Sequence, residues 1–495
     1  MTSPARALPG LLALLLIVAF AFQGTRGIWE PDEGRYSSAG INMHESGDWL
    51  IPTVDGEHPH LTKPPMTYWA LASSFALFGH NEWAARLPAA LAFIGTGLFV
   101  FGLGRRLCPA RPWLPAAVWA LSLAPVAASN IISTDPLLAF FETAAMFAFV
   151  EGWSRSGADA RRWFILMWLG WGLAFLTKGP PGLLALAGMA VFLGMHDRPR
   201  LREVFPPVGI VLFAVVAFSW FGVVIAQEPD RLDYFLGYEV RDRIFSDVHK
   251  RNAEWYGGFE VYLPVLLLGT LPWSVLAVRA AGGFRPAWAA VKGSLSAREP
   301  GALLLAYWLA VPLLVFFLAR SRLQMYVLPL FVPLALVMSR PLAASPGLHG
   351  RRLVLTLALA LAAMVGVKGI VAYAPSDRDA RALARQLETL VDPHDIDEFV
   401  FVGMRPFYGL NVYLDLEVEG VDIGERRFEY SKFVTHEGLC AELAARERSA
   451  YLLKQHHSAR FLATAGRCGW QGRLIGSVHA DGTDVAIFLM SPRAN

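Results

Sequence analysis

The sequence contains few charged residues and few cysteines. Charged residues make up 17% of the 495 residues, whereas about a quarter is usual in soluble proteins. This shortage excludes an ordinary cytosolic enzyme, a disordered chain and a nucleic-acid-binding protein. The three cysteines are too few for a disulfide framework. The sequence also lacks a P-loop and a Rossmann fingerprint, so no nucleotide-binding loop is predicted.

Long apolar stretches, by contrast, recur along most of the chain. Hydrophobic residues make up 55% of it, and the mean hydropathy is +0.40. Because about 20 apolar residues span a bilayer as a helix, the sequence predicts an all-α polytopic membrane protein with about 11–13 transmembrane helices. The candidate spans are 9–25, 84–104, 112–128, 136–152, 162–176, 181–195, 206–226, 259–279, 301–318, 323–340 and 352–373. We interpret the first as a membrane anchor, because its apolar core is long for a signal peptide and no clear small-residue cleavage site follows.

Lysine and arginine gather in alternate short loops, which predicts the orientation. Each loop on one side carries at least three basic residues, beginning with Arg105, Arg106 and Arg111. By the positive-inside rule, the N-terminus is cytoplasmic and residues 374–495 lie outside, here at a bacterial inner membrane. Residues 66–79 are short for a span, so we interpret them as an interfacial or re-entrant helix.

The last part of the chain has a different composition. Residues 374–495 hold 14 Lys/Arg and 18 Asp/Glu, and their patterning predicts a small soluble α/β domain after a membrane domain over 1–373. Helices are expected at 376–390 and 436–447, and strands at 399–404, 450–453 and 484–490. On the oxidising side of the membrane, Cys440 and Cys468 form either a disulfide or two unpaired thiols, and both alternatives stay open.

Carboxylates occur at two places on the predicted outer surface. Asp32 and Glu33 lie in the long polar loop 26–83, directly after the first span, and Asp135 lies where the fourth span begins. Carboxylates at such positions serve as general bases or metal ligands. They are equally typical of helix starts, with Asp32 or Asp135 as the N-cap. Glu142, within the fourth span, either faces Asp135 or pairs with a neighbouring helix.

Basic residues occur on the same predicted face of the membrane. They are Lys63, Lys178, Arg243 and Arg322. Cations at the interface suit a phosphate group, and close to the headgroups the natural phosphate carrier is a lipid. The plainer interpretations are a snorkelling lysine at 178 and a solvated charged loop around Arg243. Taken together, acids and cations on one face predict chemistry on a lipid phosphate at the outer surface.

Several short motifs follow one another in a specific order. They are W-E-P-D-E-G-R-Y (29–36), S-G-D-W (46–49), T-K-P-P (62–65), Y-W (68–69), A-R-L-P (85–88), S-T-D-P (133–136), T-K-G-P (177–180), G-T-L-P-W (269–273) and S-R-L-Q-M-Y-V-L-P (321–329). Over roughly 25–340 the chain resembles the membrane glycosyltransferases that use polyprenyl-phosphate sugars and have the GT-C fold. Lipid A aminoarabinose transferases and protein O-mannosyltransferases are two branches of that superfamily.

The resemblance implies roles for the matching residues. Asp32 would be the main catalytic carboxylate, with Glu33 beside it, and Asp135 the second essential acid. The residues implied to bind the donor phosphate are Arg35, Lys63, Lys178, Arg243 and Arg322.

The resemblance also implies a possible divalent metal, Zn or Mg/Mn. His249 matches a histidine associated with a bound metal in the aminoarabinose branch. In that branch a glutamate precedes the loop lysine, whereas Thr62 precedes Lys63 here. Glu57, His58 and His60 are the nearby substitutes, and this departure weakens the metal prediction.

The implied function is transfer of a sugar from a polyprenyl (undecaprenyl) phosphate donor to an envelope acceptor at the extracytoplasmic face. Lipid A or another glycolipid is the expected acceptor, with a protein or a polysaccharide as alternatives. Rival interpretations are a protein O-mannosyltransferase-like enzyme, a transporter or flippase of lipid-linked sugars, and a structural subunit. Transporters usually carry ionisable residues near the bilayer midplane and built-in repeats, whereas these spans are poor in charge and show no repeat. The sequence therefore favours the transferase.

Overall fold

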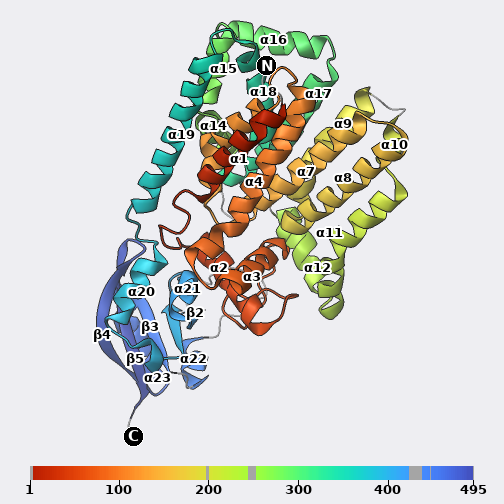
Figure 1. Cartoon of the computed structure of the whole chain (residues 1–495). Helices are drawn as coiled ribbons and strands as arrows, with labels where there is room; N and C mark the ends of the chain where they lie inside the picture. The colour runs from red at the N-terminus through yellow and green to blue at the C-terminus, as the bar shows by residue number, and fades with distance from the viewer. Residues whose placement is uncertain (1–3, 197–199, 243–251, 423–437, 446–447, 494–495) are drawn as a thin grey trace. The chain divides into compact units, whose positions relative to one another are not determined.

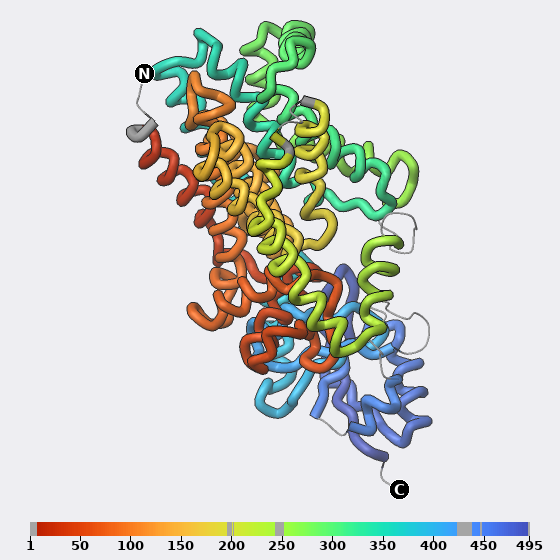
Figure 2. Tube along the Cα trace, turned by 90° about the vertical axis from the view of Figure 1, so that its right-hand side faces the viewer, coloured from red at the N-terminus to blue at the C-terminus, as the bar shows by residue number. Residues whose placement is uncertain are grey.

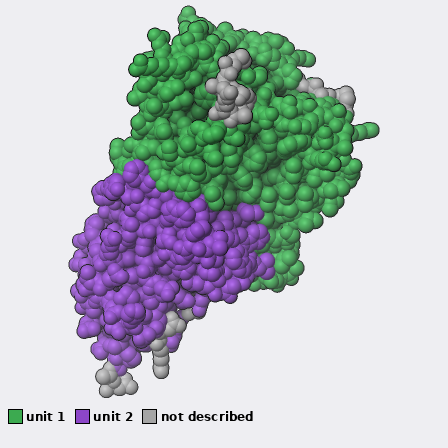
Figure 3. Space-filling view, viewed as in Figure 1, with its two compact units in different colours: residues 1–21, 89–370 green, residues 22–88, 371–495 purple. Residues whose placement is uncertain are grey.

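The chain folds into two compact units. The computed structural model describes residues 4–196, 200–242, 252–422, 438–445 and 448–493. Unit 1 contains Met1–Ala21 and Ala89–Ile370, and unit 2 contains Phe22–Pro88 and Val371–Asn495 (Figure 3). The sequence predicted the loop 26–83 as part of the membrane domain 1–373. In the structure this loop groups with the C-terminal tail.

Unit 1 is built from helices throughout its described residues (Figures 1 and 2). Helices α7, α8 and α11 pack as consecutive neighbours, and α9 packs against α17. Helices that are apolar on all sides belong in a buried or membrane environment, and most side chains of this unit's core are aliphatic or aromatic. The elements are α1 (Pro4–Phe20), α4 (Glu82–Leu107, which begins in unit 2), α5 (Leu114–Ala120), α6 (Leu123–Ala128), α7 (Asp135–Trp153), α8 (Gly157–Lys178), η1 (Pro180–Leu183), α9 (Leu184–His196), α10 (Leu201–Val204), α11 (Pro207–Gln227), α12 (Arg231–Asp233), η3 (Tyr234–Arg241), α14 (Gly257–Gly269), α15 (Trp273–Ala280), α16 (Phe284–Ser296), α17 (Pro300–Leu318), η4 (Gln324–Leu330), α18 (Phe331–Ala344) and α19 (Gly350–Tyr373).

The structure confirms a mostly helical polytopic membrane protein. Each of the apolar stretches found in the sequence lies largely within a helix or a pair of consecutive helices. Among the described residues, five helices are long and apolar enough to cross a membrane. The bent pair α14–α15, with an angle of 69° between its halves, raises this number to six. Because several of the other stretches form shorter or broken helices, the count of about 11–13 spans stays a prediction.

Unit 2 combines two helices of the polar loop with a sheet from the tail. Helix α2 (Asp32–Ser46) packs against α3 (Met66–Phe78), which occupies the short apolar segment expected to be interfacial. The five-stranded sheet has the order β2-β1-β3-β5-β4, parallel where β1 pairs with β2 and β3, and antiparallel around β5. Its strands are β1 (Glu398–Val402), β2 (Glu417–Val421), β3 (Ser449–Lys454), β4 (Trp470–Ala480) and β5 (Thr483–Pro492).

Helices cover both faces of this sheet (Figure 1). Because side chains alternate along a strand, Phe399 and Phe401 of β1 pack with α20 (Ala380–Glu388) on one face. Val400 and Val402 pack on the other face with α22 (Leu439–Ala445) and α23 (Ser458–Arg467). The remaining short elements are η5 (Pro393–Asp395), η6 (Tyr408–Leu410), α21 (Asn411–Leu414) and η7 (Gln455–His457). The predicted α/β domain is therefore present, although β2, β4 and α23 were not anticipated.

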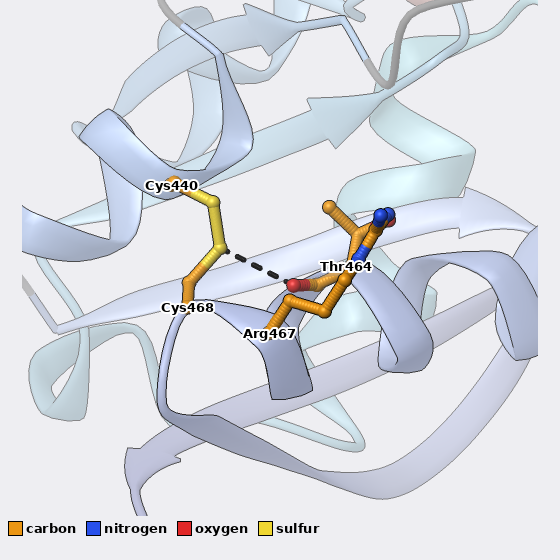
Figure 4. Close-up of a disulfide and its surroundings, with 4 residues drawn as sticks. All are labelled: Cys440, Thr464, Arg467 and Cys468. Carbon is orange, nitrogen blue, oxygen red and sulfur yellow. Dashed lines mark hydrogen bonds between the residues drawn. A yellow bond between two sulfur atoms is a disulfide. The ribbon is translucent and has the colours of Figure 1, made fainter.

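A disulfide joins two helices on one face of the sheet. Cys440 in α22 is bonded to Cys468 at the end of α23, with 5.6 Å between their Cα atoms (Figure 4). The Cys468 sulfur also lies 3.2 Å from the carbonyl oxygen of Thr464. Of the two alternatives left open by the sequence, the structure has the disulfide. Cys108 is a buried free cysteine in unit 1.

Candidate functional site

Asp32 is the first residue of α2 and is exposed. Pro31 precedes it as the N-cap and makes no side-chain capping hydrogen bond. The Asp32 side chain is 60% exposed and forms an ion pair with Arg35, one helical turn further on, whose side chain is 16% exposed. Asp32 is thus not the N-cap that its position suggested. Its carboxylate is oriented by a guanidinium and accessible from outside the unit.

Glu33, the adjacent residue, is buried in an ion-pair network. Arg26 donates to both carboxylate oxygens at 2.6 Å, and Arg86 donates to one of them at 3.2 Å. The Trp29 amide donates to the same carboxylate at 3.0 Å. Burial alone would raise the pKa of Glu33, but Arg86 and Arg26 outweigh it and hold the pKa at about 2. Glu33 is therefore a permanently charged anchor for the start of α2.

Arg35 and Lys63, the two implied phosphate-binding residues of unit 2, lie within electrostatic range of the buried His60. His60 has its pKa lowered to about 3 by burial and by the charges of Arg35 and Lys63. A neutral His60 faces the Thr62 hydroxyl at 3.0 Å. Lys63 donates to the Thr62 carbonyl oxygen at 2.7 Å. Two cations close enough to act on the same imidazole form a positive local field, as an anion site needs.

In unit 1, Asp135 and Lys178 form a buried ion pair. Asp135 is the first residue of α7, Lys178 is the last of α8, and both side chains are less than 10% exposed. The Lys178 ammonium also lies 4.2 Å from the centre of the Tyr326 ring. Glu142 lies within electrostatic range of both partners of the pair. Asp135 therefore pairs with Lys178 and makes no capping hydrogen bond, and Lys178 is not a snorkelling side chain.

Arg322 lies in the turn between α17 and η4 and is buried. Its guanidinium donates to the carbonyl oxygens of Asn252 and Glu254 at 2.6 Å and of Phe317 at 2.9 Å. These acceptors carry no formal charge, so among the described residues the Arg322 guanidinium is held by backbone carbonyl oxygens and not by a carboxylate. Tyr262 lies within electrostatic range of Arg322 and Asp135. The two cations described in unit 1 thus come from separate segments: Lys178 from the end of α8 and Arg322 from the turn before η4.

Two of the predicted site residues, Arg243 and His249, lie outside the described residues. The metal prediction also finds no support at the position before Lys63, because Thr62 offers a hydroxyl that is engaged with His60. The described His, Cys, Asp and Glu residues that come close enough to share an ion form two groups: Glu45, His80 and Asp415, and Glu398, Glu419 and Glu442. Neither group contains Glu57, His58 or His60. Because His249 lies outside the described residues, the metal site stays a prediction, and no chemical step is derived through a metal.

Sequence reasoning missed the two arginines that hold Glu33. Arg86 is fully buried and donates to the carbonyl oxygens of Gln23, Arg26 and Gly27 at 3.0, 2.8 and 2.7 Å. A signal for it existed, because Arg86 belongs to the A-R-L-P motif and stands in an otherwise apolar run. An arginine in such a run requires an internal partner. Arg26 offered no comparable signal.

Comparisons with known proteins agree with this architecture. The family described as dolichyl-phosphate-mannose-protein mannosyltransferase matches residues 62–222. The undecaprenyl phosphate-alpha-4-amino-4-deoxy-L-arabinose arabinosyl transferase 2 of Sodalis glossinidius is 34% identical over 68% of this chain and 59% of its own length. The enzyme of the same name from Pseudomonas fluorescens is 31% identical over 73% of this chain and 65% of its own length. This chain therefore spans about three fifths of the curated relatives it matches.

A solved structure extends the likeness to the whole fold. ArnT from Cupriavidus metallidurans, in a crystal structure bound to undecaprenyl phosphate, superposes with a TM-score of 0.75 at 20% identity. The match covers 98% of each chain. This likeness shows that the two chains share a fold. In sequence, the chain is similar to the two arabinosyl transferases named above over 59% and 65% of their lengths.

Proposed function

We propose that this protein transfers a sugar from an undecaprenyl phosphate donor to an envelope acceptor. The observation that supports it best is the 31–34% identity to aminoarabinosyl transferases over about 70% of the chain. The sugar named for those relatives, 4-amino-4-deoxy-L-arabinose, is the donor sugar we propose, and lipid A is the acceptor. Supporting residues are the accessible carboxylate of Asp32 and the buried cations of unit 1.

The proposed reaction is a single displacement. The Asp32 carboxylate accepts the proton of the acceptor hydroxyl, and that oxygen forms a bond to C1 of the sugar. The bond between C1 and the phosphate oxygen breaks, and the phosphate leaves with the electron pair. A general base of this kind contributes about 10²–10⁴ in rate. Because Arg35 pairs with Asp32, it orients the carboxylate for the transfer.

The leaving phosphate requires positive charge that is already in place. Lys63 and Arg35 supply it in unit 2, and Lys178, Arg322 and Arg243 are the candidates in the remainder of the chain. A preorganised donor near the developing charge is worth about 3–4 kcal/mol in a water-poor site. Lys178 suits this role because a lysine is a mobile point charge. It can move from Asp135 toward a phosphate oxygen within the reach of its side chain.

We also propose that the C-terminal domain faces the extracytoplasmic side of a bacterial inner membrane. Its Cys440–Cys468 disulfide supports this placement, because disulfides persist in oxidising compartments and are rare in the cytosol. The basic loops predicted for the opposite side support the same orientation. An active site outside the cytoplasm also suits a lipid-linked donor, which needs no nucleotide.

The decisive experiment is mass spectrometry of envelope glycolipids from cells that lack the protein, express it, or express Asp32→Asn. We expect lipid A to carry an aminopentose-sized mass increment with the wild-type protein only. The variant should remain folded in the membrane, since Asp32 is exposed and its replacement buries no charge. Wild-type modification by Asp32→Asn would refute its role as the base.

The other outcomes separate the rival functions. Unmodified lipid A together with an accumulated sugar-linked carrier in the deletion strain would move the acceptor to a protein, as the matched mannosyltransferase family suggests, or to a polysaccharide. A hexose-sized increment would change the donor sugar. Lipids that are unchanged in all three strains would favour a transporter of lipid-linked sugars, and direct transport in reconstituted vesicles would test it.

A further inference from the structure

The segment before Asp32 is bound to the C-terminal part of unit 2. The amide of Glu30 donates to the Arg378 carbonyl oxygen at 2.9 Å, and the Ala380 amide donates to the Ile28 carbonyl oxygen at 2.9 Å. Trp29 and Asp379 thus form an isolated antiparallel bridge. These bonds connect the turn that leads into α2 with the chain that enters α20.

A second set of bonds reaches the same loop from α20 and α21. The Tyr413 hydroxyl accepts from the Ile28 amide at 2.9 Å and donates to Glu82 at 3.0 Å. Arg381 donates to Glu82 at 3.1 Å and to the Thr25 carbonyl oxygen at 2.7 Å. Both ends of the loop are therefore attached to the domain that follows the last predicted span.

Glu30 occupies the centre of this attachment. It is 7% exposed, and its Oε1 accepts from the Gly409 amide at 2.6 Å. Its Oε2 is buried without a hydrogen-bond partner among the described residues. A Cβ atom on Gly34 would lie 2.0 Å from Oε1, and one on Gly409 would lie 2.9 Å from it. The carboxyl group thus fits between two glycines, one in the D-E-G-R-Y motif and one in η6.

We propose that Glu30 is a positioning residue, through which the C-terminal domain fixes the turn that presents Asp32. The inference rests on the proposed function, because it assigns Asp32 the role of base. Glu30 touches no reacting atom in this scheme. It acts two residues before Asp32, where a shift of about 1 Å in the catalytic group can cost about 100-fold in rate.

The charge state of Glu30 makes the proposal testable by its pH dependence. Burial raises the pKa of Glu30 to about 8, while the Gly409 amide and Arg35 oppose the rise and Glu33 and Asp32 add to it. The charged side chains on the segments packed against it are Asp32, Glu33 and Arg35 on α2 and Arg378, Asp379 and Arg381 beside or on α20. Glu30 is therefore neutral at pH 7 and ionises in mildly alkaline solution, which places a further negative charge beside two carboxylates.

The test compares Glu30→Gln and Glu30→Ala in the full-length protein, with Glu388→Gln, an exposed glutamate at the end of α20, as the matched control. Turnover of the lipid-linked donor is measured from pH 6 to pH 9.5. We expect Glu30→Ala to lower kcat by up to about 100-fold with an unchanged KM for the donor. In the wild type, ionisation of Glu30 should lower kcat above pH 8. Glu30→Gln, which keeps the acceptor oxygen and the neutral state, should have the wild-type kcat at pH 7 and lack this alkaline decline.

Two results would overturn the proposal. One is wild-type kcat and wild-type pH dependence in Glu30→Ala. The other is a Glu30→Gln variant that retains the alkaline decline. Hydrogen exchange of the amides at 28–36 and 405–411 needs no substrate, so it separates this inference from the proposed function. Faster exchange of both segments in Glu30→Ala with no transfer by the wild type would leave the attachment standing and refute the reaction.

Discussion

Each unit buries a carboxylate against basic side chains, but the two arrangements differ. In unit 2, Glu33 accepts from two guanidinium groups and a backbone amide. In unit 1, Asp135 pairs with one lysine that also contacts an aromatic ring. A guanidinium is a rigid planar fork, whereas an ammonium on a flexible stem is a mobile point charge. The comparison indicates that the arginines around Glu33 fix the backbone at the start of α2. The lysine paired with Asp135, by contrast, can move and is suited to bind a phosphate.

Removal of Arg86 should produce the largest effect. Arg86→Met removes one of the two arginines that pair with Glu33 and takes a donor from three buried carbonyl oxygens. Breaking a buried ion pair costs about 3–5 kcal/mol. Chemical denaturation in detergent measures the loss. Arg448→Met is the matched control, because Arg448 pairs with Asp397 at the surface of the same unit and exposed pairs contribute little. Equal stability of the two variants would contradict the anchoring role of Arg86.

Changes to the Asp135–Lys178 pair should affect activity more than stability. Lys178→Met is expected to lower turnover about 10²–10³-fold, as expected for loss of one preorganised donor. It also leaves Asp135 buried without its cation, so stability falls as well. The double variant Asp135→Asn/Lys178→Met removes both charges and should recover most of that stability.

Turnover is measured for the wild type, for Lys178→Met and for the double variant, and this completes the comparison between the units. The double variant should stay inactive although it is stable, because the charge that serves the phosphate is missing. Recovery of turnover together with stability would show that this pair, like Glu33 with its arginines, has a structural role only.

The sequence predicted the elements well and the contacts of the site poorly. Apolar runs gave the helices of unit 1, and alternation at 484–490 gave β5, because these patterns follow from burial along a regular element. Motif order indicated Asp32, Asp135 and Lys178. The grouping of 22–88 with 371–495 could not be predicted, because backbone bonds such as Glu30 to Arg378 are independent of side-chain type. The sequence likewise could not distinguish the exposed Asp32 from the buried Glu33, because the difference depends on their ion-pair partners.

The last prediction contrasts two carboxyl groups of the same loop. The pKa of Glu33 is lowered to about 2 from an ordinary 4.5, so its stabilisation is complete above pH 4.5 and is lost as the pH falls through 2. Between pH 7 and pH 4 the loss is on the order of 1 kcal/mol. The pKa of Glu30 is raised to about 8, so stability falls as the pH rises from 4.5 to 8 and is then level.

Stability measured against pH tests both signs at once. Glu33→Gln should be less stable than the wild type at pH 7, yet its stability should change less between pH 7 and pH 4. Glu30→Gln should keep its stability between pH 5 and pH 8, where the wild type loses it. Identical slopes in the wild type and both variants would mean that neither carboxyl group titrates with folding. The contrast between a charged anchor and a neutral one, three residues apart, would then be wrong.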